Sequence, residues 1–103
     1  MEQRRHPRIY EPFPILVHGV DARGEEFELE TVLDNFSAGG LYMRLLWRVA
    51  VGAKLFAVVR LAADPLAWEA APCVAVRGVV RRVEPQPNGT YGVGVAFTRH
   101  RFL

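Results

Sequence analysis

Residues 26–45 read EFELETVLDNFSAGGLYMRL, two runs of alternating side chains separated by a polar turn. Phe27, Leu29, Thr31 and Leu33 alternate with the glutamates at 26, 28 and 30, and from 41 to 45 leucine and methionine alternate with tyrosine and arginine. Such alternation predicts two strands, each with one buried and one wet face. The stretch Asp34–Gly40 between them combines side-chain acceptors, a hydroxyl and two glycines, which suits a tight turn lined with polar groups.

The same alternation predicts four further strands, which start near Phe13, Leu55, Val74 and Tyr91. Reversals are expected at 21–24, 51–53 and 85–89, and a longer irregular connection at 64–72. Gly78 suggests a bulge or bend within its strand. Six short strands with no helical stripe favour an antiparallel barrel or a strongly bent sandwich.

Length and composition fit one small domain. The chain has 103 residues, of which half are apolar, and its net charge of +2 is too small to indicate general nucleic-acid binding. The single cysteine, Cys73, excludes an internal disulfide and gives no metal-ligand pattern. Without a signal peptide or a long apolar run, the chain is expected to be soluble and cytoplasmic, with no membrane insertion.

Motifs for catalysis are not found. The three histidines are scattered without a second ligand at metal spacing, so no metal site is predicted. Ser37 is the only serine and lacks a nucleophile-elbow pattern, and Gly92-Val93-Gly94 is not followed by a helix. We therefore expect a protein that is not an enzyme, with neither catalytic residues nor a cofactor.

An arginine-rich segment opens the chain. Arg4, Arg5 and Arg8 lie within residues 1–12, which have no periodicity and contain two prolines, so this segment is predicted to be an extended arm before the barrel domain of 13–103. The spacing Arg4-x-x-x-Arg8 is weak by itself, because Arg77 and Arg81 repeat it. A solvated charged terminus is the competing interpretation.

A second motif lies in the turn that separates the first two runs. Asn35, Ser37 and Gly40 fill the pattern Asp or Asn, any residue, Ser, any two, Gly. These residue types also build ordinary hairpin connections, so a purely structural turn is the alternative.

Taken together, the arginine arm and the Asn-x-Ser-x-x-Gly turn between the second and third strands resemble the PilZ domain family. Similarity extends over almost the whole chain and includes Tyr91–Phe97, which looks like the closing strand of that family. The resemblance implies a six-stranded antiparallel β-barrel of the split-barrel type and a receptor for the bacterial second messenger cyclic di-GMP. Members often add a C-terminal helix, for which residues 98–103 leave room for little more than a turn.

The chemistry of that ligand agrees with the residues present. Two phosphates and two guanines call for planar cations and for acceptors of guanine N–H groups, and arginine binds phosphate and guanine edges bidentately. The predicted site contains Arg4, Arg5, Arg8, Asn35, Ser37, Gly39 and Gly40, with Asp34 and Arg44 as additional candidates. The two glycines would let the backbone approach the ligand closely.

The arm is expected to close over the nucleotide, so that binding slows amide exchange in residues 1–10. Arg8→Ala and Ser37→Ala are expected to weaken binding, and Arg81→Ala to do little. We further expect a downstream protein partner or a fused domain.

Two other functions remain open. One is a PilZ-like protein–protein adaptor that does not bind nucleotide. The other is a small barrel that binds single-stranded nucleic acid through Tyr42, Trp47 and Trp68, although aromatic residues on strands are more often core than stacking platforms.

Overall fold

The computed structural model describes residues 13–37, 39–61 and 71–103, which form six β-strands. Their bounds are β1 Pro14–Val20, β2 Glu26–Phe36, β3 Gly40–Leu45, β4 Lys54–Arg60, β5 Cys73–Pro85 and β6 Tyr91–Phe102. The described residues contain no helix, and therefore none that could span a membrane. The predicted arm of residues 1–12 lies outside the described residues, as does most of the connection at 64–72.

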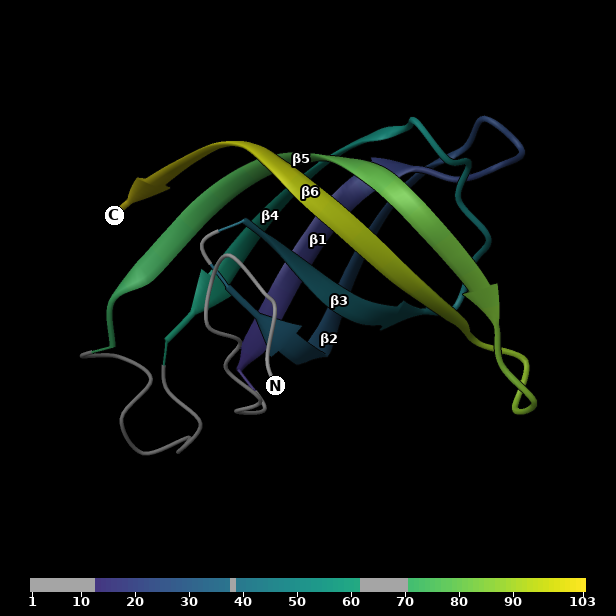
Figure 1. Ribbon diagram of the computed structural model, residues 1–103, viewed down its shortest axis with the longest axis horizontal. Helices are drawn as coiled ribbons and strands as arrows, with labels where there is room; N and C mark the ends of the chain where they lie inside the picture. Colours follow the sequence, from purple (N-terminus) through teal and green to yellow (C-terminus); the bar gives the residue numbers. More distant parts are fainter. Residues whose placement is uncertain (1–12, 38, 62–70) are drawn as a thin grey trace, which may run out of the picture.

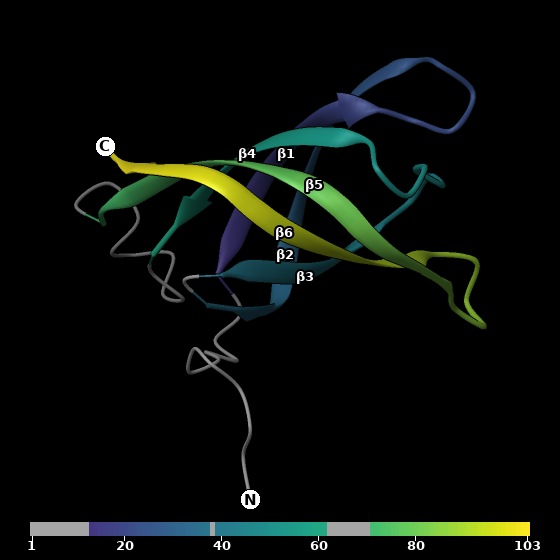
Figure 2. The same cartoon turned by 45° about the horizontal axis from the view of Figure 1, so that its top comes forward.

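All strand pairs are antiparallel and the sheet closes on itself in the order β1-β2-β3-β6-β5-β4. The prediction of a six-stranded antiparallel barrel is thus confirmed, and the bent sandwich is excluded. The two longest strands, β5 and β6, run side by side across the molecule, with β3 on the other side of β6 (Figures 1 and 2). The outer faces of these three strands and of β2 form one continuous surface.

The inner face of the barrel is entirely apolar among the described residues. Every buried side chain there is aliphatic, aromatic or methionine, and no described polar side chain is buried. The most enclosed are Ile15, Val17, Met43, Leu45, Val49, Val59, Val80 and Val93. The alternation seen in the sequence therefore assigns the faces of the strands correctly over most of their length.

Turns lie where the sequence predicts them. Gly24, Gly52 and Gly89 adopt positive φ values of 86°, 91° and 86°, a region that glycine enters without steric cost. In the last of these turns the Asn88 side-chain oxygen accepts a hydrogen bond from the Thr90 backbone N–H at 3.1 Å. The turns at Gly24 and Gly89 close the hairpins β1–β2 and β5–β6, whereas the turn at Gly52 leads from β3 to β4, which are not paired.

The last residues of the described chain form part of a strand, where the sequence is expected to leave room for little more than a turn. Strand β6 continues to Phe102, and its residues 99–102 pair with Val74 to Arg77 of β5. The register shifts at this point, because Thr98 is an extra residue between the pairs Arg77–Arg99 and Gly78–Phe97. The irregularity lies opposite Gly78, but the extra residue is Thr98 of β6 and not a residue of β5 as predicted, and β6 continues beyond it.

The aromatic residues considered as nucleic-acid platforms are engaged within the fold. The ring of Trp47 packs on that of Phe27 with centroids 5.2 Å apart, and the Arg82 guanidinium lies over the ring of Tyr42. Trp68 lies outside the described residues.

Truncating Leu45 should test the inner face directly. Leu45 is 0% exposed, whereas its neighbour Leu46 is 59% exposed. We expect Leu45→Ala to lower the free energy of unfolding by about 2–5 kcal/mol through lost burial and a residual cavity. Leu46→Ala should change it by less than about 0.5 kcal/mol. Urea unfolding measures both, and equal losses would contradict the assignment of faces.

Candidate functional site

A bulge in β2 turns two consecutive polar residues outward. Leu33 is buried and Phe36 packs against the core, although they are three positions apart, which strict alternation forbids. Strand pairing accommodates this by shifting from Leu33–Met43 to Asn35–Tyr42. One extra residue in the strand therefore places both Asp34 and Asn35 on the outer face.

A second bulge, in β5, does the same for two arginines. Val80 is 0% exposed and Val83 packs against the core, again three positions apart. The pairing with β6 shifts between Val80–Val95 and Arg82–Gly94, so Arg81 and Arg82 both point outward.

The two bulges face one another across β3 and β6. Asn35 pairs with Tyr42, Tyr42 with Gly94, and Gly94 with Arg82, which makes one row across four neighbouring strands. A hollow of about 450 Å³, here called the turn hollow, covers this row. Its lining residues are Asn35, Ser37, Gly39, Gly40, Leu41, Tyr42, Arg81, Arg82, Gly94, Val95 and Ala96. Its floor is the nearly bare outer face of β6.

The turn at the edge of the turn hollow is held by its own serine. The Ser37 backbone N–H donates to the Gly40 carbonyl at 3.0 Å, and the Ser37 hydroxyl donates to the same carbonyl at 3.4 Å. The Gly39 N–H in turn donates to Ser37 Oγ at 3.3 Å. Gly40 itself has no room for a side chain, because a Cβ there would overlap the Val95 carbonyl oxygen.

The opposite rim contains a stacked arginine. Arg82 lies over the Tyr42 ring with its guanidinium carbon 5.3 Å from the centroid, and its Nε is 3.5 Å from Glu84 Oε1. Tyr42 donates its hydroxyl proton to the same carboxylate oxygen at 2.7 Å. Partial burial, and to a lesser extent this hydrogen bond to Glu84, raise the pKa of Tyr42 above its ordinary value. These contacts with Tyr42 and Glu84 fix the position of the Arg82 guanidinium at the turn hollow.

Two polar groups of the turn hollow have no partner within the described part of the chain. Neither the Asn35 amide nor the Arg81 guanidinium makes a hydrogen bond or ion pair there. Both are therefore available to a ligand, whereas Ser37 is already committed to the turn.

The structure brings together four of the residues predicted from the sequence, namely Asn35, Ser37, Gly39 and Gly40. Asp34 and Arg44 lie beside the turn hollow and bind each other, with Arg44 Nε 3.1 Å from Asp34 Oδ2 and Nη2 3.2 Å from Oδ1. Arg4, Arg5 and Arg8 lie outside the described residues, so their part in the site stays a prediction.

Sequence reasoning missed Arg81 and Arg82 as members of the site. The available signal was a change of phase, because buried valines occur at 74, 76 and 80, and the next core valine comes at 83 instead of 82. That shift marks a bulge with two outward residues, and the arginines occupy it.

No group of three or more His, Cys, Asp or Glu side chains in the described residues could hold a metal ion. What those residues do offer is a shallow site with hydrogen-bonding and cationic groups on two rims and a bare floor. The fold and site thus define a small barrel with a polar hollow on its outer face.

This chain belongs to the PilZ domain family, whose model matches residues 2–101. PilZ domains form a family of cyclic di-GMP receptors and are typically non-catalytic. The family assignment suggested by the two sequence motifs is confirmed, and the closed six-stranded barrel is the fold it implies. No curated protein matches the sequence.

Solved structures share the fold at low identity. The Bacillus subtilis inhibitor of motility MotI/DgrA superposes with a TM-score of 0.75 at 20% identity, over 96% of this chain and 44% of that one. The Escherichia coli YcgR PilZ domain with c-di-GMP gives 0.63 at 15% identity, over 95% and 79%. An F420 reductase gives 0.61 at 15% identity, over 89% and 91%. This chain thus spans less than half of the motility inhibitor, and the barrel alone does not distinguish a receptor from an enzyme.

The steric requirement at Gly40 can be tested against Gly94. A Cβ at Gly40 would overlap the Val95 carbonyl, whereas at Gly94 its nearest neighbour is 3.5 Å away. We expect Gly40→Ala to lower the free energy of unfolding by about 1–3 kcal/mol, because β3 must shift against β6. Gly94→Ala should leave it within about 0.5 kcal/mol. Chemical denaturation compares the two, and a larger loss for Gly94→Ala would contradict this packing.

Proposed function

We propose that this chain is a receptor for cyclic di-GMP that binds the nucleotide in the turn hollow. The observation that supports this is the juxtaposition, across Tyr42 and Gly94, of the Asn35–Gly40 turn with Arg81 and Arg82. Family membership supplies the class of ligand, and the groups in the turn hollow match it chemically.

Each rim suits a different part of a cyclic dinucleotide. The unpartnered Asn35 amide offers both a donor and acceptors to a guanine edge. Arg81 and Arg82 offer bidentate N–H groups to a phosphate or to guanine O6 and N7, and the plane of Arg82 is already fixed by Tyr42. The floor of glycine and alanine on β6 leaves room for a flat base against the strand.

The remaining parts of the mechanism are carried by residues before the barrel. In this proposal residues 1–12 form an arm that closes over the bound nucleotide, and Arg4, Arg5 and Arg8 bind its phosphates or guanine edges. The barrel of 13–103 acts without catalysis in the cytoplasm, and it passes the signal to a downstream protein or to a fused domain.

The second candidate is an adaptor of the same family that does not bind nucleotide. The two functions differ in one measurement. Calorimetric titration of the full chain with cyclic di-GMP, with GTP and a short single-stranded RNA as controls, should show saturable binding of cyclic di-GMP alone. Absence of heat with all three would favour the adaptor.

Variants of the turn hollow should weaken that binding selectively. Asn35→Ala, Arg81→Ala and Arg82→Ala are each expected to raise the Kd roughly tenfold or more, because a well-placed polar contact to a nucleotide contributes about 1–3 kcal/mol. The effect expected for Arg81 replaces the earlier expectation that its loss would do little. Ser37→Ala should lower both affinity and thermal stability, since its hydroxyl holds the turn.

Arg48→Ala provides the matched control for these variants. It removes the same charge from an exposed position that does not line the turn hollow. We expect its Kd to stay within about twofold of the parent, because exposed charges at a distance are screened. Equal losses for Arg48→Ala and Arg82→Ala would point to non-specific attraction and contradict the proposed site.

Closure of the arm has its own readout. Amide exchange in residues 1–10, followed by mass spectrometry, should slow when cyclic di-GMP is added, and Arg8→Ala should reduce that protection. Identical exchange with and without saturating ligand would remove the arm from the mechanism while leaving the turn hollow intact.

A further inference from the structure

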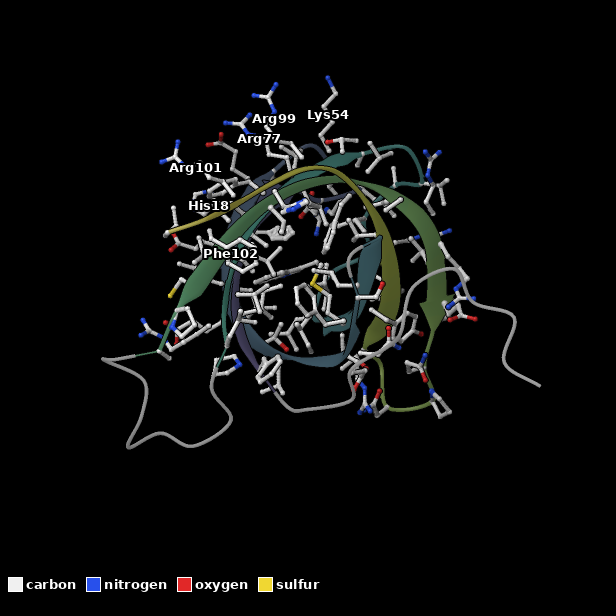
Figure 3. All side chains as sticks on the ribbon, turned by 60° about the vertical axis from the view of Figure 1, so that its left-hand side comes forward. His18, Lys54, Arg77, Arg99, Arg101 and Phe102 are labelled. Atoms are coloured by element: carbon white, nitrogen blue, oxygen red, sulfur yellow. The ribbon has the colours of Figure 1, made fainter. Side chains whose placement is uncertain are left out.

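Four cations gather on a part of the outer surface that the turn hollow does not use. These cations lie on the same side of the ribbon (Figure 3), and we call them the basic patch: Lys54 on β4, Arg77 on β5, and Arg99 and Arg101 on β6. Phe56 pairs with Arg77 and Arg77 with Arg99, so these three side chains are neighbours in one cross-strand row.

The charges of the basic patch are not neutralised by the fold. Within the described residues, none of the four cations makes an ion pair. One of them makes a cation–π contact instead, since the Arg77 guanidinium lies over the Phe56 ring, 5.7 Å from its centroid. Arg77 and Arg99 also stand directly opposite each other, a like-charge pairing that destabilises a sheet. A surface that costs stability in the free protein is a good candidate for a binding surface.

The basic patch borders a hollow of about 620 Å³. Lys54, Phe56, Arg77 and Arg99 line it on one side, and His18, Val20 and Glu26 from β1 and β2 on the other. Phe56 and Val20 are 40% and 43% exposed, so the hollow offers apolar contact beside the cations. It shares no lining residue with the turn hollow.

We propose that the basic patch docks an acidic segment of a partner protein, with carboxylates on Lys54, Arg77 and Arg99 and a neighbouring apolar side chain over Phe56 and Val20. Stacked on Phe56, Arg77 still presents the N–H edge that binds a carboxylate bidentately. This proposal names the surface and the chemistry of a partner, and it does not depend on nucleotide binding.

Two features favour a protein segment over a nucleic acid. Arg77 lies over the face of Phe56 on which a flat base would stack, whereas an aliphatic side chain can still contact the remaining part of the ring, because Phe56 is 40% exposed. Glu26 lines the far wall of the hollow, and next to it on β2 Glu28 accepts a hydrogen bond from His18 at 2.9 Å, so carboxylates would repel a phosphate backbone that crossed the hollow. Unlike a phosphate backbone, a protein segment can place an uncharged apolar residue where it passes these carboxylates.

The test uses the full chain and a fluorescein-labelled peptide of sequence EELFEE, followed by fluorescence anisotropy at low ionic strength. We expect saturable binding that weakens with added salt, and at least tenfold weaker binding to the double variant Arg77→Glu/Arg99→Glu. The control Arg23→Glu/Arg48→Glu makes the same change of net charge at exposed positions outside the hollow and should stay within about twofold of the parent. The peptide EEGGEE, which lacks the apolar pair, should bind more weakly than EELFEE.

The milder variant Arg99→Gln/Arg101→Gln keeps the test valid if charge reversal impairs folding, and it should weaken binding about threefold or more. Equal losses for the patch and control variants would overturn the proposal. Tighter binding of an oligodeoxythymidine of equal charge would overturn it in favour of a nucleic acid. A dimer in sedimentation that Arg77→Glu/Arg99→Glu dissociates would overturn it in favour of a second copy of this chain. Arg77→Glu/Arg99→Glu should leave cyclic di-GMP titration unchanged, so failure here is separable from failure of the turn hollow.

Discussion

Side chains along a β-strand point alternately to the two faces of its sheet, and a small closed barrel accepts only apolar side chains on its inner face. Two consecutive polar residues that both point outward therefore conflict with the alternation of inward and outward side chains along a strand. In this chain the conflict is resolved by single inserted residues. One in β2 and one in β5 each release two consecutive polar side chains to the surface while the core on either side stays in phase.

The position of the site follows from these two irregularities and from strand order. Because β3 and β6 are the strands between β2 and β5, the two insertions lie three strand spacings apart, roughly 14 Å by ordinary strand spacing. Bulky residues on the outer face of β6 would fill this gap. The sequence places Gly92, Gly94 and Ala96 there instead, and their inward neighbours Val93 and Val95 belong to the core.

The sequence predicts those features that depend on residues close together in the chain, and not those that depend on which strands lie side by side. Alternation and turn residues identify the strands and most reversals, since both are local effects of side-chain burial and backbone freedom. The Asn35–Gly40 motif was found because it is compact in sequence. Arg81 and Arg82 were not, because their relevance depends on β5 lying beside β6, a pairing that only the closed barrel establishes. Likewise, Thr98 to Phe102 has little strand signal of its own and becomes a strand through pairing with Val74 to Arg77.

The residues that line the turn hollow also differ in how freely the sequence can change at each position. Alanine at Gly40 in the turn would overlap the Val95 carbonyl, so a change there is penalised through folding before recognition of a ligand is affected. Asn35 and Arg81 on the rims bear no such structural duty within the described residues. Substitutions at these two positions can thus alter what the turn hollow recognises while the packing of the barrel stays unchanged.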